Sequence, residues 1–318
     1  MAVSTERAVE ITEYYLEHGE AKTMSDFDIT SETLHRYTRE YKTVSESFEP
    51  STTLLKIKEQ YSDAELKAIA KGGRLTPGMT NVPIVDFEGD VLTIGVMSDM
   101  HSGSKYFSEA WLDSAYNEFA KSGVDMVVNV GDVVEGMSNR AGHIYELEHI
   151  GYDAQKEYAI KLLSQWSGTQ YFIDGNHDRW YVKAGNAGAL IVKDICNEVP
   201  GAVFLGHDEG NITVNGCVIK LWHGEDGSSY AISYRIQKLV EAFSPGEKPN
   251  VLFAGHVHKQ GYFFDRSIHC VSTGAMCRQS SWMRSTRKAN HAGFHIVKMA
   301  INNGGVAWFE PRWFPFYS

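Results

Sequence analysis

The chain has 318 residues, of which 43% are hydrophobic and 12% aromatic, enough for one large domain and a small one. This composition excludes a chain that is disordered throughout. The formal net charge of -10 argues against a protein that coats nucleic acid or an anionic membrane through its overall charge. The four cysteines are scattered without a C-x-x-C pair, so we expect reduced, buried thiols.

The first residues, MAVSTERAVE, lack the basic and apolar regions of a secretory signal peptide. No uninterrupted apolar run approaches the roughly 20 residues that a membrane span needs. We therefore expect a cytoplasmic protein that does not contact a membrane.

Residues 1–45 are predicted to form a small, separate all-α module. Three helices are expected, and the third begins at Ser31. Thr30 is placed to cap this helix, and Ile29 and Leu34 have the spacing of a hydrophobic staple across the cap.

The third helix carries Arg36 and Arg39 on its expected exposed side. The arrangement resembles the helix-turn-helix modules of DNA-binding and mobile-element proteins, which implies nucleic-acid contacts by these two arginines. Residues 1–50, however, hold five Lys or Arg against eleven Asp or Glu, a balance that suits DNA poorly. The alternative is a module for docking a protein partner or for self-association.

Residues 46–85 are expected to form a linker with a short helix over residues 63–71. Residues 72–83 contain three glycines and two prolines, which is typical of a loop. The boundary of the second domain is placed near Asp86, so that residues 86–318 form one domain.

Strands alternate with helices from residue 91 to about residue 243, and short strands without intervening helices follow. This order predicts a mixed, layered α/β domain. Five of the apolar, strand-like runs end in polar residues. They lead into Asp99-Met100-His101, Gly131-Asp132, Gly175-Asn176-His177-Asp178, His223 and Gly255-His256-Val257-His258.

In an α/β sheet, ligands bind beyond the carboxyl ends of the strands. Two neighbouring divalent ions need a carboxylate that bridges them, together with neutral nitrogen and oxygen ligands. The residues at these five strand ends supply both kinds of ligand, so the sequence predicts a metal centre.

The ordered motifs D-x-H, G-D, G-N-H-D, a lone His and G-H-x-H closely match the calcineurin-like metallophosphoesterase family over roughly residues 88–310. The resemblance implies a four-layer α/β/β/α sandwich with two metals at the strand ends. The first metal would be held by Asp99, His101 and His258, the second by Asn176, His223 and His256, and Asp132 would bridge both.

The resemblance also implies a hydrolytic reaction, in which a hydroxide that bridges the ions attacks phosphorus in line. His177 would protonate the leaving oxygen or stabilise the transition state, and Asp178 would orient His177 or support the ligands. Manganese is the favoured ion, although iron, nickel and zinc also suit such ligands. The non-enzymatic alternative is a DNA- or protein-binding scaffold, but no ligand position is replaced here.

The substrate is less well defined by the motifs. The motif Gly-Asn-His-Asp resembles that of nucleases of the Mre11/SbcD type and of general phosphodiesterases more than that of protein phosphatases. Protein serine/threonine phosphatases typically have Gly-Asn-His-Glu and G-D-x-x-D-R-G, where this chain has GDVVEG at 131–136. DNA is therefore the favoured substrate, with small nucleotides or phosphoproteins as alternatives.

Several basic residues are candidates for substrate contacts. Arg140 and Arg179 follow ligand motifs and would either grip phosphate oxygens or stand on the surface. Residues 278–288 form the one concentrated basic stretch, which suits a single-stranded or frayed nucleic acid through phosphate contacts and base stacking. The alternative is a solvated loop that pairs with the acidic surface. The candidate contacts in this stretch are Trp282, Arg284, Arg287 and Lys288.

Overall fold

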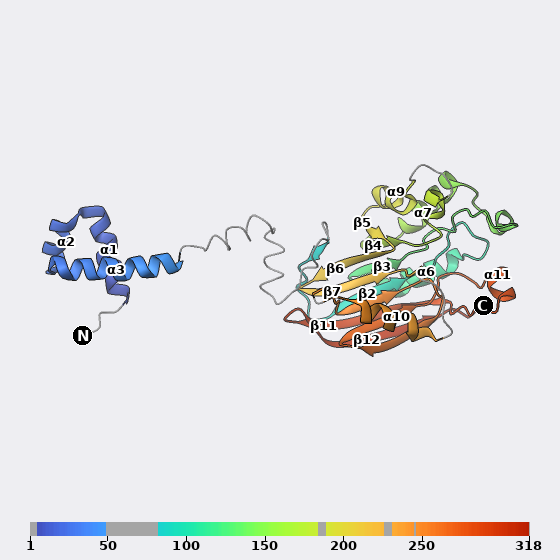
Figure 1. Ribbon diagram of the computed structural model, residues 1–318. Coiled ribbons are helices and arrows are strands. Elements are labelled where there is room, and N and C mark those ends of the chain that lie inside the picture. The colour runs from blue at the N-terminus through green and yellow to red at the C-terminus, as the bar shows by residue number, and fades with distance from the viewer. Residues whose placement is uncertain (1–4, 49–81, 184–188, 226–230, 245, 318) are drawn as a thin grey trace. The chain divides into compact units, whose positions relative to one another are not determined.

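The computed structural model describes residues 5–48, 82–183, 189–225, 231–244 and 246–317 (Figure 1). The chain divides into two compact units, Met1–Asp63 and Ala64–Ser318. In the described part of the chain, no helix combines the length and the apolar character that crossing a membrane would require. The short helix predicted at 63–71 lies outside the described residues.

The smaller unit contains three helices, α1 (Thr5–His18), α2 (Glu20–Phe27) and α3 (Ser31–Phe48). They pack around a small core of Ile11, Leu34 and Tyr37, with Ile29 against it. The backbone N–H of Thr33 donates to Thr30 Oγ1 at 3.3 Å, so Thr30 caps α3 as its position predicts.

The larger unit is built from two six-stranded sheets. The sheet that contains β2, here the β2 sheet, has the order β12 (Gly305–Pro315), β11 (Gly293–Asn302), β2 (Leu92–Met97), β3 (Met126–Val130), β4 (Thr169–Asp174) and β5 (Ala202–His207). The β8 sheet has the order β1 (Ile84–Val85), β6 (Glu209–Val214), β7 (Cys217–Trp222), β8 (Val251–Ala254), β10 (Ile268–Thr273) and β9 (Gln260–Asp265).

Parallel pairing places the functional strand ends together. Strands β2 to β5 pair in parallel, and so do β7, β8 and β10. Strand β1 also pairs in parallel with β6, whereas β11 with β2 and β12, β6 with β7, and β9 with β10 are antiparallel. The carboxyl ends of the parallel strands therefore meet at one edge of each sheet.

The unit has four layers. The apolar faces of the two sheets pack together through side chains such as Ile94, Val128, Leu221 and Phe253. Helices α6 (Glu109–Ser122), α7 (Tyr152–Leu163) and α9 (Ile191–Glu198) contribute to a second core on the outer face of the β2 sheet. Helix α10 (Ile232–Ala242) covers the β8 sheet. This is the predicted α/β/β/α sandwich.

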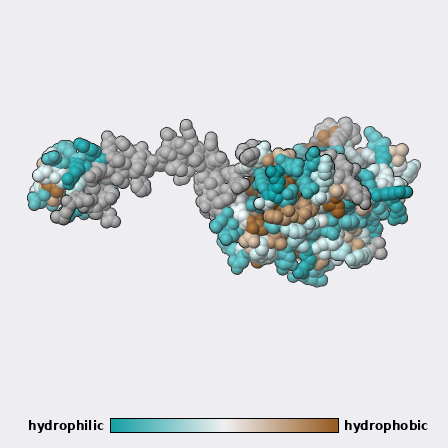
Figure 2. Space-filling model, turned by 60° about the horizontal axis from the view of Figure 1, so that its bottom comes forward, coloured by the Kyte–Doolittle hydropathy of each residue, from teal (hydrophilic) through white to brown (hydrophobic). Residues whose placement is uncertain are grey.

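Short helices lie among the loops: α8 (Trp180–Lys183), α11 (Ser281–Ser285) and the 3-10 turn at His143–Glu146. Hydrophilic residues cover much of the face seen in Figure 2, with hydrophobic patches between them.

Two features of the sheets were not expected from the sequence. Strands β5 and β6 were missed, because the polar stretch at 206–210 that joins them interrupts their apolar runs. The β8 sheet also begins at Ile84, just before the boundary placed at Asp86, because β1 pairs in parallel with β6.

Candidate metal centre

The ligands predicted for the first ion converge from two sheets. Asp99 and His101 follow β2, and His258 follows β8. His258 Nε2 lies 3.2 Å from Asp99 Oδ1 and 3.2 Å from His101 Nε2, which is itself 3.8 Å from Asp132 Oδ2. Donor atoms that each lie about 2.0–2.2 Å from one ion are about 3–3.5 Å apart, so this spacing fits a shared ion.

The ligands predicted for the second ion form an adjoining group. His223 Nε2 lies 3.1 Å from Asp132 Oδ2 and 3.1 Å from Asn176 Oδ1. His256 Nδ1 is 2.8 Å from the same Asn176 oxygen. Asp132 Oδ2 therefore lies close to histidines of both groups, as a bridging carboxylate must.

One buried oxygen in this cluster is placed to face a cation. Asp99 is fully buried, and its Oδ2 accepts from the Ser98 hydroxyl and the His256 backbone N–H. Among the described residues, Asp99 Oδ1 has no hydrogen-bond partner, although His258 Nε2 is 3.2 Å away. Burial of a carboxylate oxygen without a partner costs folding free energy. A metal ion bound by both Asp99 Oδ1 and His258 Nε2 would remove that cost.

Hydrogen bonds fix which nitrogen of each histidine faces the centre. His223 Nδ1 donates to the carbonyl of Val130 at 2.7 Å, and His258 Nδ1 donates to Asn290 Oδ1 at 2.8 Å. In the neutral form of both rings, Nε2 is therefore the nitrogen without a proton and the one able to bind a metal.

Strained backbone accompanies the ligands. Asp99, His101, Asp132, His256 and His258 have φ angles between 51° and 71°, in the left-handed region. This conformation costs about 1–2 kcal/mol for a residue with a side chain. Five strained residues in one cluster are typical of a functional site, where the surrounding structure enforces the geometry.

The charge distribution also suits cations. Burial raises the pKa of the Asp132 carboxyl, but the imidazoles of His223 and His177 outweigh it and hold this pKa well below its usual value. Burial lowers the pKa of His101, but the neighbouring Cys277 and Glu135 outweigh it and raise this pKa to about 10. The negative field that favours a protonated imidazole favours a metal ion equally.

Comparison with known families agrees with this geometry. Residues 92–260 match the sequence profile of the calcineurin-like phosphoesterases. The chain belongs to this family. It is accordingly a metal-dependent phosphoric ester hydrolase.

Solved structures of similar fold include phosphoesterases. An archaeal phosphodiesterase has 15% identity and a TM-score of 0.40, covering 70% of this chain and 100% of its own. The Escherichia coli phosphoesterase Yfce has 16% identity and a TM-score of 0.40, covering 69% and 98%. Vacuolar Protein Sorting 29 from Cryptosporidium parvum has 11% identity and a TM-score of 0.40, covering 72% and 100%. The comparison with curated proteins found no match.

His177 stands beside the ligands of this phosphoesterase and is held in one orientation. Its Nδ1 donates to the backbone carbonyl of Glu135 at 2.9 Å, which leaves Nε2 for proton exchange. The ring packs on Trp180, with centroids 3.8 Å apart, and meets the edge of His101 at 4.4 Å. Burial lowers the pKa of His177 despite the nearby carboxylate of Asp132.

Asp178 and Arg179 stabilise the loops around the site. The Asp178 carboxylate accepts the backbone N–H groups of Gly175 and Val134 at 2.8 and 2.9 Å, tying together the loops after β3 and β4. Arg179 forms ion pairs with Asp174, Asp208 and Glu225. Arg179 lies outside the lining of the cavity described next.

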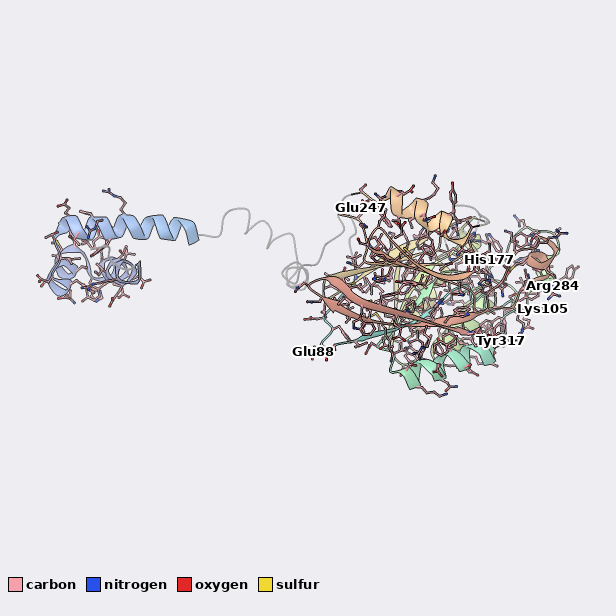
Figure 3. All side chains as sticks on the ribbon, turned by 90° about the horizontal axis from the view of Figure 1, so that it is seen from below. Glu88, Lys105, His177, Glu247, Arg284 and Tyr317 are labelled. Carbon is pink, nitrogen blue, oxygen red and sulfur yellow. The ribbon has the colours of Figure 1, made fainter. Side chains whose placement is uncertain are left out.

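A cavity of about 780 Å³ opens over the ligands. Its wall includes Arg140, Trp282, Arg287 and Lys288, whereas Arg284 is not part of the lining. Lys288 Nζ lies 4.5 Å and the Arg140 guanidinium 5.9 Å from the Trp282 ring centroid. His177, Lys105 and Arg284 lie toward the same end of the larger unit, away from Glu88 (Figure 3).

Sequence reasoning missed three residues of the site. Glu135 places one carboxylate oxygen 3.0 Å from His101 Nδ1 and the other 2.8 Å from His143 Nε2. Asn290 holds His258. Cys277 is buried beside His101 and His258. Of the three, only Glu135 had a signal, since it follows Asp132 within the same glycine-bounded motif.

Proposed function

We propose that this chain is a cytoplasmic phosphodiesterase with a centre of two divalent ions, and that DNA is its favoured substrate. The first ion would be held by Asp99, His101 and His258, the second by Asn176, His223 and His256, and Asp132 would bind both. The observation that carries the proposal is the basic, aromatic cavity wall directly over these ligands. Small nucleotides and phosphoproteins are the alternative substrates.

Divalent ions bound by these residues would stabilise charge on phosphoryl oxygens and would supply a nucleophile at neutral pH. Manganese is the favoured ion, and iron, nickel and zinc also suit nitrogen and oxygen ligands.

The protein supplies the acid. Because His177 Nδ1 is committed to the Glu135 carbonyl, Nε2 is the atom that donates a proton to the leaving oxygen. Burial lowers the pKa of His177, which makes the protonated ring a stronger acid but leaves less of it protonated at neutral pH. Stacking on Trp180 prevents the ring from swinging away from the substrate.

The cavity wall supports a nucleic-acid substrate. The Trp282 side chain is 42% exposed, with Lys288 and Arg140 near its ring. An aromatic ring among cations offers a stacking surface for a base and charges for the neighbouring phosphates. Each stacked base contributes about 1–3 kcal/mol, so loss of the ring should weaken DNA binding about fivefold or more.

The test compares two substrates in matched variants. Trp282→Ala and Arg287→Ala should each lower kcat/KM on single-stranded DNA about fivefold or more and leave turnover of a small chromogenic diester unaffected. Trp308→Ala is the control for Trp282, because Trp308 on β12 has the same 42% exposure. Arg284→Ala is the control for Arg287. Equal losses on both substrates would refute a DNA-binding wall.

For the smaller unit we propose a targeting role, through DNA or through a protein partner. Arg36 and Arg39 on α3 are exposed, which supports contact with phosphates. Arg36→Ala with Arg39→Ala in the full chain should weaken DNA binding and reduce its salt dependence, with diester turnover unchanged. Unchanged DNA binding would favour protein docking or self-association instead.

A further inference from the structure

A sixth strand end reaches the metal centre. Strand β10 runs parallel to β8, and the chain beyond it continues to Cys277. The backbone N–H of Met276 donates to the carbonyls of Ser98 and Asp99 at 3.0 and 3.2 Å. This anchor places Cys277, which is 3% exposed and lines the cavity, directly beside the first group of ligands.

The thiol lies within reach of an ion held by the two histidines of that group. Cys277 Sγ and the nearest ring nitrogens of His101 and His258 are all within 4.8 Å of one another. Metal–sulfur and metal–nitrogen bonds are about 2.3 and 2.1 Å long. A sulfur and a nitrogen bound to the same ion are therefore about 3.6 Å apart at a tetrahedral angle, and at most about 4.4 Å apart. The separations in the structure are at most 4.8 Å, so an approach of no more than about 1.2 Å brings all three donors onto one tetrahedral ion.

An independent observation points to a cation at the same place. Asp99 Oδ1 is buried, has no hydrogen-bond partner among the described residues, and lies 3.2 Å from His258 Nε2. A buried carboxylate oxygen and an imidazole nitrogen at this distance have the spacing of two ligands of one ion.

Asn290 fixes the position of Cys277 relative to the imidazole of His258. Its Nδ2 donates to the carbonyl of Cys277 at 2.9 Å, while its Oδ1 accepts from His258 Nδ1 at 2.8 Å. One side chain thus fixes both the segment that carries sulfur and the ring that presents Nε2. Such supporting bonds are a regular feature of metal sites.

We propose that Cys277 is a further ligand of the first ion, which then has one thiolate together with Asp99, His101, His258 and the shared Asp132. The proposal rests on the two-ion centre described above. The second ion has only nitrogen and oxygen ligands. Because thiolates favour softer metals, the first position should prefer zinc, cobalt or ferrous iron, and the second should accept manganese.

The test uses cobalt as a spectroscopic probe of the full chain. Metal-stripped protein loaded with Co²⁺ should show a near-ultraviolet thiolate-to-cobalt charge-transfer band. The band should persist in Cys196→Ser, whose thiol lies in the core beneath α9, and disappear in Cys277→Ser. Cys277→Ser should also lower Zn²⁺ affinity at least about tenfold and change Mn²⁺ affinity less.

Two outcomes overturn the proposal: a wild-type protein that binds two Co²⁺ ions without the band, or a band that survives Cys277→Ser. Wild-type protein that binds no Co²⁺ would refute the two-ion centre itself. If Cys277→Ser fails to fold, X-ray absorption of the Co²⁺-loaded wild type decides. A cobalt–sulfur distance of about 2.3 Å is expected, and a cobalt spectrum with nitrogen and oxygen neighbours alone would contradict ligation.

Discussion

Gly175 controls the position of the bridging carboxylate, so Gly175→Ala should damage the metal centre more than the fold. A Cβ at this position would lie 2.2 Å from Asp132 Oδ1, 2.5 Å from the Asp132 backbone nitrogen and 2.7 Å from His223 Cε1. Real Cβ contacts are almost never closer than 3.0 Å, so the Asp132 carboxylate must move by at least about 0.8 Å.

The magnitude follows from that displacement. Misplacing a catalytic group by about 1 Å costs about 10²-fold in rate. Overpacking of a tight site costs about 1–3 kcal/mol of folding free energy. We therefore expect kcat/KM on a small diester to fall about 100-fold and metal affinity to fall, while the variant stays folded.

The assay compares Gly175→Ala with Gly261→Ala. At Gly261 the added Cβ meets only Ile232 Cγ2, at an ordinary 3.6 Å, so this control should keep its activity. Diester turnover, metal content and thermal unfolding are measured for both variants. A Gly175→Ala protein with full metal content and turnover within about twofold of wild type would refute the argument, since the required displacement exceeds the tolerance of such sites.

Three further predictions concern the proposed acid His177, the His258 partner Asn290 and the metal ions. His177→Ala should lower kcat about 10²–10⁴-fold with metal content unchanged, and a parallel loss of metal would show that His177 is a ligand instead. Asn290→Ala should lower metal affinity about 10–100-fold in a calorimetric titration, because His258 loses its partner; unchanged affinity would contradict that role. Chelation should lower the unfolding temperature, since an ion at 100 times its Kd adds about 2.7 kcal/mol of stability; a temperature insensitive to metal would exclude a preformed site.

The sequence was sufficient to predict which side chains meet at this centre, because their positions depend on local patterns. Asp99, Asp132, Asn176, His223 and His256 each follow an apolar run that becomes a strand. Parallel pairing brings the ends of such strands together, so their spacing along the chain was enough to predict their convergence.

Other parts of the site depend on contacts that no local pattern records. Cys277 reaches the centre through the antiparallel pair β9 and β10, and Asn290 through a loop that follows α11. Arg179 is adjacent to a ligand motif but does not line the cavity. It instead forms ion pairs with Asp208 and Glu225, which are distant in sequence. Such partners emerge only once the sheets are assembled.

The measurement that tests the central claim most directly is hydrolysis by metal-stripped protein resupplied with Mn²⁺. Linear single- and double-stranded DNA and a small diester are the substrates, with Asp132→Asn alongside, because that change removes the bridging charge. We predict cleavage of DNA and of the diester by the wild type and none by the variant. Cleavage that survives in Asp132→Asn, or no turnover of any substrate by metal-loaded wild type, would contradict the account.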